Sequence, residues 1–238
     1  MKTVLLVALL VLYCSASDKK GVGCDAGCSA NTLTQMRAGW WYNWGAQPHF
    51  SSQVQFIPMI FSINKIGDLP NYSVHLLGFN EANLEGLSVD QAAAVWPQLV
   101  AKAGTIASPS QSGNPSYDGS WLLNFINHPS RPKVNYIAVH SYGAHSGQSF
   151  IDSITKIHDK FQKPLWITEF APQDNADSSS NPFPQSQVNE YIDVVIPWLE
   201  KTDFVHRYAW HSASRGTSAL WDASGQPTET GRRYASKG

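Results

Sequence analysis

The stretch that decides the fold is Val74-His75-Leu76-Leu77-Gly78-Phe79-Asn80-Glu81-Ala82-Asn83, a mostly apolar run that ends in polar side chains. A run of about four to eight apolar residues bounded by polar ones is typical of a strand in a parallel sheet, which is covered on both faces. Asn80 and Glu81 then stand at the carboxyl end of this strand. In barrels and in open parallel sheets, that end carries the chemistry because the loops that follow the strands meet there.

A second stretch of the same design is Pro164-Leu165-Trp166-Ile167-Thr168-Glu169-Phe170-Ala171. It is also apolar, and it also brings a glutamate to the end of the expected strand. Two buried strands that each deliver a glutamate predict a pair of carboxylates at one edge of the sheet. The competing interpretation is that each glutamate pairs with a surface Lys or Arg, which is the usual environment of a lone Glu.

Strand patterns alternate with helical patterns along the whole chain. This alternation predicts a parallel sheet with crossover helices, and eight strands fit a single compact (β/α)8 TIM barrel with short loops. Pro58 is an irregularity in the third strand pattern that the pattern alone does not explain. The expected strands cover residues 20–24, 40–45, 54–61, 74–81, 105–109, 136–140, 164–171 and 205–210. The expected helices cover 30–38, 63–69, 92–103, 118–127, 149–162 and 188–199, and a last short one follows Thr228.

The first 16 residues have the pattern of a secretory signal peptide. Lys2 precedes an uncharged apolar run over 4–13, and Cys14-Ser15-Ala16 supplies small residues before the expected cleavage point. The apolar run is too short to cross a membrane, which takes roughly 20 residues. We therefore expect a secreted, extracellular protein whose mature part, residues 17–238, is one catalytic barrel domain.

Composition narrows the classes of partner. The chain has 17 Lys+Arg and 18 Asp+Glu, a formal net charge of −1 and no basic run, which argues against nucleic acid and anionic membranes as partners. Aromatic residues make up 12% of the chain and include nine Trp. Flat rings stack on sugar faces, so carbohydrate is the expected ligand class, although any one Trp can equally be core filler.

Two cysteines, Cys24 and Cys28, remain in the mature chain. In an oxidising compartment they can close a small disulfide loop, and the alternative is two free thiols. Asn71-Tyr72-Ser73 is an N-glycosylation sequon and indicates a surface loop.

Four motifs resemble, in order and spacing, those of glycoside hydrolase family 128, a family of secreted endo-β-1,3-glucanases. They are Gly78-Phe79-Asn80-Glu81-Ala82-Asn83, His140-Ser141-Tyr142, Pro164-Leu165-Trp166-Ile167-Thr168-Glu169-Phe170 and Tyr208-Ala209-Trp210. The likeness runs from about Lys20 to Tyr234. An Asn-Glu pair alone is weak evidence, whereas the four motifs together are specific.

The resemblance implies retaining hydrolysis of β-1,3-glucan, with Glu81 as general acid/base and Glu169 as nucleophile. Glu81 must keep its proton near neutral pH, which a neighbouring negative charge on Glu169 favours. It further implies substrate-binding roles, or contacts with the catalytic carboxylates, at the ends of other strands. In these roles we expect Asn80 on the sugar 2-hydroxyl, Tyr142 donating to Glu169, His140 on a hydroxyl or a carboxylate, Trp210 as the platform beneath the sugar, and Asn43 and Trp44 in neighbouring subsites.

Four alternatives stay open at this stage. His140 can be an ordinary strand-end histidine. A zinc hydrolase could use His140 with His145, or His206 with His211, but neither pair has i,i+4 spacing or an acidic cluster beside it. A non-catalytic β-glucan-binding protein on the same barrel, or a retaining hydrolase of another β-glycan, is the other candidate. We expect a monomer without cofactor or metal.

Overall fold

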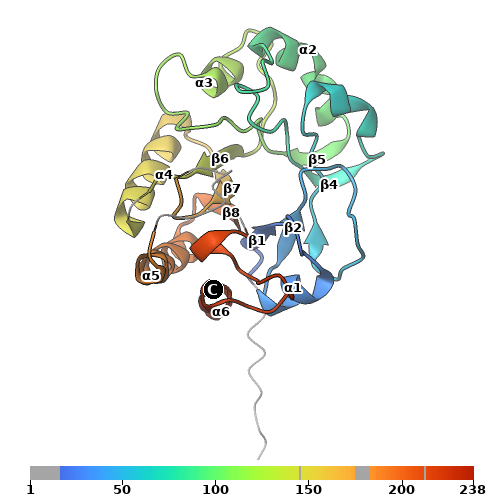
Figure 1. Ribbon diagram of the computed structural model, residues 1–238. Helices are drawn as coiled ribbons and strands as arrows, with labels where there is room; N and C mark the ends of the chain where they lie inside the picture. Colours follow the sequence, from blue (N-terminus) through green and yellow to red (C-terminus); the bar gives the residue numbers. More distant parts are fainter. Residues whose placement is uncertain (1–16, 145, 175–182, 212) are drawn as a thin grey trace, which may run out of the picture.

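The computed structural model describes residues 17–144, 146–174, 183–211 and 213–238, so the predicted signal segment lies outside the described residues. The described chain forms a ring of parallel strands with helices outside it (Figure 1). All eight predicted strands are confirmed. They are β1 (Lys20–Gly23), β2 (Trp40–Tyr42), β3 (Gln55–Phe56), β4 (Ser73–Leu76), β5 (Ala103–Ile106), β6 (Ile137–Ser141), β7 (Leu165–Phe170) and β8 (Val205–Trp210).

The ring closes through two ladders and two single bridges. Six strands pair in the order β3-β2-β1-β8-β7-β6, and β4 pairs with β5. Parallel bridges between Met59 and Leu77 and between Ala107 and Tyr136 join the two sheets. Every strand therefore lies beside its sequence neighbour and the last beside the first, which confirms the predicted (β/α)8 fold.

The helices are short, which explains how the barrel fits into so few residues. The α-helices are α1 (Ala30–Gln35), α2 (Val89–Val100), α3 (Trp121–Ile126), α4 (Gly147–Phe161), α5 (Gln185–Lys201) and α6 (Glu229–Ser236), and the 3-10 helices are η1 (Ile63–Asp68) and η2 (Gly216–Ser218). A 3-10 helix thus replaces the α-helix between β3 and β4. Among the described residues, no helix has both the length and the apolar character needed to span a membrane.

Pro58 explains why the third strand is shorter than predicted. Proline has no N–H to donate to a ladder, and β3 ends two residues before it. The Pro58 carbonyl still accepts from the Leu77 N–H at 2.9 Å, and Met59 then makes the bridge to Leu77. The segment after β3 therefore stays in the barrel wall, although its pairing with the segment after β4 is interrupted.

Side chains alternate between the barrel interior and the layer under the helices, as the pleat of a strand requires. Trp40 and Tyr42 of β2 point inward and join the interior cluster, whereas Trp41 between them packs in the outer core. Trp40 lies against Trp166 of β7 with 5.4 Å between ring centroids. Large aromatic rings thus fill the amino-terminal half of the barrel.

Two further sequence predictions concern the cysteine pair and the glycosylation sequon. Cys24 and Cys28 are bonded to each other directly after β1, which confirms the disulfide. Asn71 is exposed in the turn before β4, as expected for a sequon in a surface loop.

A group of basic and aromatic side chains lies at the amino-terminal ends of the strands. Arg207 is buried there, with its guanidinium over the rings of Trp40 and Trp166. His206 accepts from the Trp166 Nε1–H at 2.6 Å. Half-buried His75 contacts Thr105 Oγ1 at 2.6 Å. Burial, the Arg207 charge and His206 lower the pKa of His75 to about 4.

This lowered pKa predicts that the fold loses stability in mild acid. Between about pH 6.5 and about 4, the unfolded chain binds a proton at His75 that the folded chain does not, so stability falls as pH falls through that window. In the variant His75→Gln, which keeps an amide for Thr105, we expect the drop in Tm from pH 7 to pH 4 to shrink by roughly a few degrees. Scanning calorimetry at both pH values measures it. A drop equal to that of the unsubstituted protein would contradict the assignment.

Candidate active site

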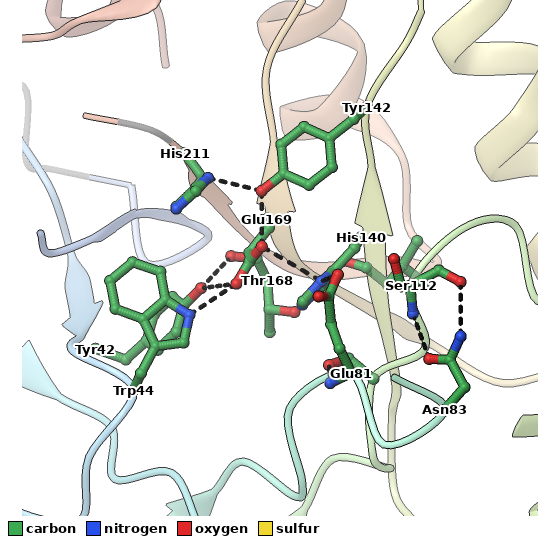
Figure 2. A network of polar contacts seen from close by, with 12 residues as sticks. Tyr42, Trp44, Glu81, Asn83, Ser112, His140, Tyr142, Thr168, Glu169 and His211 are labelled. Carbon is green, nitrogen blue, oxygen red and sulfur yellow. Dashed lines mark hydrogen bonds and ion pairs between the residues drawn. The ribbon is translucent and has the colours of Figure 1, made fainter. Parts of the chain in front are cut away.

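The two predicted glutamates meet at the carboxyl ends of the strands (Figure 2). Glu169 is in β7 and is 3% exposed. Glu81 follows β4, and its side chain is 20% exposed. His140 Nδ1, from β6, lies 3.0 Å from Glu81 Oε1 and 3.3 Å from Glu169 Oε2. One imidazole nitrogen therefore lies within reach of both carboxylates.

A strained backbone presents Glu81. Its φ of 39° is in the left-handed region, which is uncommon for a residue other than glycine. Its backbone N–H donates to Ser110 Oγ at 3.0 Å, and in this way the loop after β5 holds the turn. Strain at a residue of this kind is characteristic of functional sites.

Glu169 is surrounded by hydrogen-bond donors. The Tyr142 hydroxyl donates to Glu169 Oε2 at 2.7 Å, and the Trp44 indole N–H donates to Oε1 at 2.7 Å. The Tyr42 hydroxyl lies 3.3 Å from Oε1 and also donates to the Thr168 carbonyl at 2.9 Å. A buried carboxylate with this many donors is stable in its charged form.

The electrostatics agree with that geometry. Burial alone raises the pKa of Glu169, but the nearby imidazoles of His140 and His211 and the hydrogen bonds from Tyr142 and Trp44 outweigh burial, so this pKa is lowered. Burial lowers the pKa of His140, but the charges of Glu169 and Glu81 and the hydrogen bond to Glu81 outweigh burial. The pKa of His140 is therefore raised. Glu169 is therefore an ionised carboxylate, and the His140 imidazole beside it retains its proton more readily than usual.

A hollow of about 380 Å³ opens beside the pair. Glu81, His140 and Tyr142 form part of its wall. Leu84, whose side chain is exposed, lies at its edge. The other lining groups are mainly polar and include Ser112, Asn114 and Asp174. Such a lining offers hydroxyl partners and one apolar surface, which suits a sugar.

The structure brings most of the predicted residues to this place, with some changes of role. His140 contacts both carboxylates, and Tyr142 donates to Glu169 as expected. Trp44 contacts Glu169, the predicted nucleophile, and its role in a neighbouring subsite stays a prediction. Asn43 is used within its own loop: its amide N–H donates to Gln47 O, and its Oδ1 accepts from the Gly45 N–H. Its role in a subsite stays a prediction.

Asn80 lies next to the pair but lines a different hollow, of about 170 Å³, beside η1. It is buried, and its Oδ1 meets no hydrogen-bond donor within the described part of the chain. A buried acceptor of this kind is one that a ligand hydroxyl can satisfy. Its role on the sugar 2-hydroxyl stays a prediction.

The prediction for Trp210 is wrong. Its ring is 0% exposed, packs against Phe170, Tyr191 and Tyr234, and donates its N–H to the Ser218 carbonyl at 2.8 Å. Residues along a strand alternate in direction. Ala209 points into the barrel, so Trp210 points under the helices and cannot form a platform beneath a sugar.

Sequence reasoning missed two residues of the site. Tyr42 follows the inward-facing Trp40 by two positions, and this spacing indicates that it also faces inward. His211 directly follows β8, and its Nδ1 lies 2.7 Å from the Tyr142 hydroxyl. The sequence feature that points to His211 is its position directly after the last strand. The preceding residue, Trp210, was predicted to have a role in the site instead.

Among the described residues, Glu81, His140 and Glu169 also form a group whose ligand atoms lie within 4.8 Å of one another, close enough for a divalent ion. Contacts of His140 Nδ1 with both carboxylates already explain why the three side chains lie so close together. The zinc alternative on His206 and His211 is wrong because these residues lie at opposite ends of β8. His145 of the other pair lies outside the described residues.

A model of the family described as "Glycosyl hydrolase catalytic core" matches residues 21–234. Among curated proteins, Alkali-sensitive linkage protein 1 of Schizosaccharomyces pombe is 27% identical over 246 residues. The alignment covers 93% of this chain and 45% of that protein, so the chain spans a little under half of its relative.

Solved structures with the same fold include members of glycoside hydrolase family 128. A glycoside hydrolase family 128 (subgroup I) endo-β-1,3-glucanase from Amycolatopsis mediterranei, in complex with laminaripentaose, is 26% identical with a TM-score of 0.82, covering 93% of this chain and 100% of that one. A family 128 (subgroup VII) oligosaccharide-binding protein from Trichoderma gamsii shares the fold, at 20% identity and a TM-score of 0.75, covering 92% of each chain. The chain belongs to the glycosyl hydrolase catalytic core family and, as its motifs predict, to glycoside hydrolase family 128.

Proposed function

We propose that this protein is a secreted hydrolase that cuts internal bonds of β-1,3-glucan by double displacement, with Glu169 as nucleophile and Glu81 as general acid/base. One observation carries the proposal. The two carboxylates come from distant parts of the chain and lie within contact of the same imidazole nitrogen, and Glu81 lines the hollow beside them.

The separation of the carboxylates supports retention of configuration. Oxygen atoms of Glu81 and Glu169 lie within 4.8 Å of each other. Retaining glycosidases hold their carboxyl groups about 5–5.5 Å apart, whereas inverting enzymes need about 6.5–9.5 Å to admit a water molecule between carboxylate and sugar. The close pair favours direct attack by one carboxylate on the anomeric carbon.

Burial supports the division of roles. Glu169 is buried and has a lowered pKa, so it is available as an anion for attack. Glu81 lines the hollow and is partly exposed, so it can reach the leaving oxygen and later an incoming water. Glu81 gives its proton to the leaving oxygen as Glu169 attacks, so it is a carboxylate in the glycosyl-enzyme and can then accept a proton from the attacking water.

Substrate class is supported by family membership and by the lining of the hollow. The Amycolatopsis mediterranei relative is an endo-β-1,3-glucanase with laminaripentaose bound. In this chain, Ser112, Asn114 and Asp174 supply polar partners for hydroxyl groups, and Leu84 supplies an apolar surface. We therefore favour laminarin-type glucan and internal cleavage.

The alternative is a protein that binds glucan without cutting it, since the Trichoderma gamsii relative is an oligosaccharide-binding protein. The complete set of donors on Glu169 argues for chemistry, because mere binding does not require a buried ionised carboxylate. Binding of laminarin without new reducing ends at any pH from acid to neutral would decide for the alternative.

Secretion is part of the proposal and has its own support. The disulfide between Cys24 and Cys28 suits an oxidising compartment, and Asn71 is exposed. Sequencing the amino terminus of the exported protein should give Ser17 as the first residue. A product that retains residues 1–16 would contradict the predicted cleavage.

The first prediction for the enzyme concerns the two carboxylates. We expect Glu169→Gln to lower kcat on laminarin at least roughly a thousandfold while laminarin binding persists. Glu81→Gln should also be slow on laminarin, but it should form the glycosyl-enzyme rapidly from an aryl laminaribioside whose leaving group needs no proton. Rapid reaction of the aryl substrate with Glu169→Gln instead would exchange the two roles.

The second prediction concerns stereochemistry. Proton NMR of the first products from laminarihexaose should show the β-anomer before mutarotation, together with fragments of several lengths. Early α-anomer would contradict double displacement. Release of glucose alone would contradict internal cleavage.

The third prediction concerns the donor from Trp44. In Trp44→Phe the indole N–H is lost while an aromatic ring remains, so Glu169 loses a charge-assisted hydrogen bond. Kcat/KM should fall roughly tenfold to a hundredfold, and its acidic limb should move to higher pH because Glu169 becomes easier to protonate. The matched control is Trp198→Phe, on α5, where the ring packs against Phe150 and Phe204. Equal kinetics for both variants would contradict the role of Trp44.

A further inference from the structure

His211 is a buried histidine to which the proposed mechanism assigns no role. It is 8% exposed, and its backbone N–H donates to the Phe170 carbonyl at 3.0 Å, which fixes the residue beside the end of β7. Its ring meets the rings of Trp44 and Tyr142 edge-on, at 5.2 and 5.8 Å between centroids. Both of these neighbours donate to Glu169, so His211 lies behind two of the donors that hold the nucleophile (Figure 2).

Proton counting makes the contact between His211 and Tyr142 informative. The Tyr142 oxygen lies 2.7 Å from Glu169 Oε2 and 2.7 Å from His211 Nδ1. A phenol has one proton, so it can donate to only one of these partners. An ionised carboxylate can only accept. Both contacts are satisfied together only when His211 Nδ1 carries a proton and donates to the Tyr142 oxygen.

The other tautomer would undo the arrangement. With the proton on Nε2, the Nδ1 lone pair would attract the phenol proton, and Glu169 Oε2 would face an oxygen lone pair at 2.7 Å. A neutral imidazole is the relevant form near neutral pH. Burial lowers the pKa of His211, His140 and Arg215 act in the same direction, and Glu169 and Asp25 oppose them without reversing the shift. The choice is therefore between two tautomers of a neutral ring.

We propose that His211 is a positioning residue for the nucleophile, whose Nδ1–H donates to the Tyr142 hydroxyl and commits the phenol proton to Glu169. The inference rests on the proposed function for its catalytic consequence, but its structural content does not depend on activity. Chains of hydrogen bonds polarise one another, so the contact also strengthens the bond that Tyr142 makes to the carboxylate.

The kinetic test uses His211→Phe, which keeps an aromatic ring beside Trp44 but has no N–H. We expect kcat/KM on laminarin to fall roughly threefold to tenfold and its acidic limb to move to higher pH, because Glu169 is held less firmly as an anion. In His211→Asn, an amide N–H can replace Nδ1–H, and the acidic limb should return toward that of the wild type. His158→Phe, where the ring lies on α4 and stacks on Phe204, controls for the loss of a histidine.

A double-mutant cycle with Tyr142→Phe tests the route of action. If His211 acts through Tyr142, adding His211→Phe to that variant should change kcat/KM by less than roughly twofold. Fully additive losses, or an acidic limb in His211→Phe identical to that of the wild type, would overturn the proposal. Thermal denaturation of each variant excludes a general loss of folding.

A measurement without substrate separates this inference from the proposed function. Long-range proton–nitrogen NMR of the wild-type protein, assigned by the signals missing in His211→Phe, should show the Nδ1–H tautomer. The Nε2–H tautomer would overturn the inference even if laminarin is hydrolysed. Failure of the wild type to hydrolyse laminarin would instead overturn the proposed function and leave the tautomer to decide the inference.

Discussion

A buried carboxylate that must stay ionised is the constraint on which the rest of the site depends. Glu169 has almost no access to water, so protein donors must replace its hydration. Those donors come from separate parts of the ring: Trp44 follows β2, and His140 and Tyr142 lie at the end of β6, with His211 after β8 behind Tyr142. These strands all belong to the six-stranded sheet, whereas Glu81 follows β4 of the other sheet, so closure of the ring is what brings the second carboxylate to Glu169.

The same constraint explains two of the five positive φ angles that residues other than glycine have in the described chain. Trp44 and Glu81 both have positive φ, at 60° and 39°. The first turns an indole N–H back toward Glu169, and the second turns a carboxylate toward the hollow. Conformations of this kind cost on the order of 1–3 kcal/mol each, so they persist only where the surrounding structure enforces them. At Glu81, hydrogen bonds to Ser110 in the loop after β5 provide that enforcement.

Sequence patterns predicted the fold and the central pair because both depend on local periodicity. Apolar runs marked all eight strands, and the polar residues at their ends marked Glu81, Glu169, His140 and Tyr142. Patterns failed where direction mattered. Trp210 was placed at the correct strand end but on the wrong face, and the role of His211 depends on a contact with a residue 69 positions away. Local composition does not show which face a residue at a strand end takes. It also does not show which distant residues are in contact.

The two ends of the barrel divide stability from chemistry. At the amino-terminal end, Trp40 and Trp166 fill the interior and the Arg207 guanidinium lies over both rings, so that part of the barrel is packed like a core. At the carboxyl end, the interior contains a buried anion, two positive-φ residues and an open hollow, none of which stabilises a fold by itself. A chain with helices of only six residues at α1 and α3 has little else to compensate for these features. The aromatic packing at the amino-terminal end therefore stabilises a barrel whose carboxyl end contains these destabilising features. Substitutions of Trp40 or Trp166 should affect folding before they affect the geometry of Glu81 and Glu169.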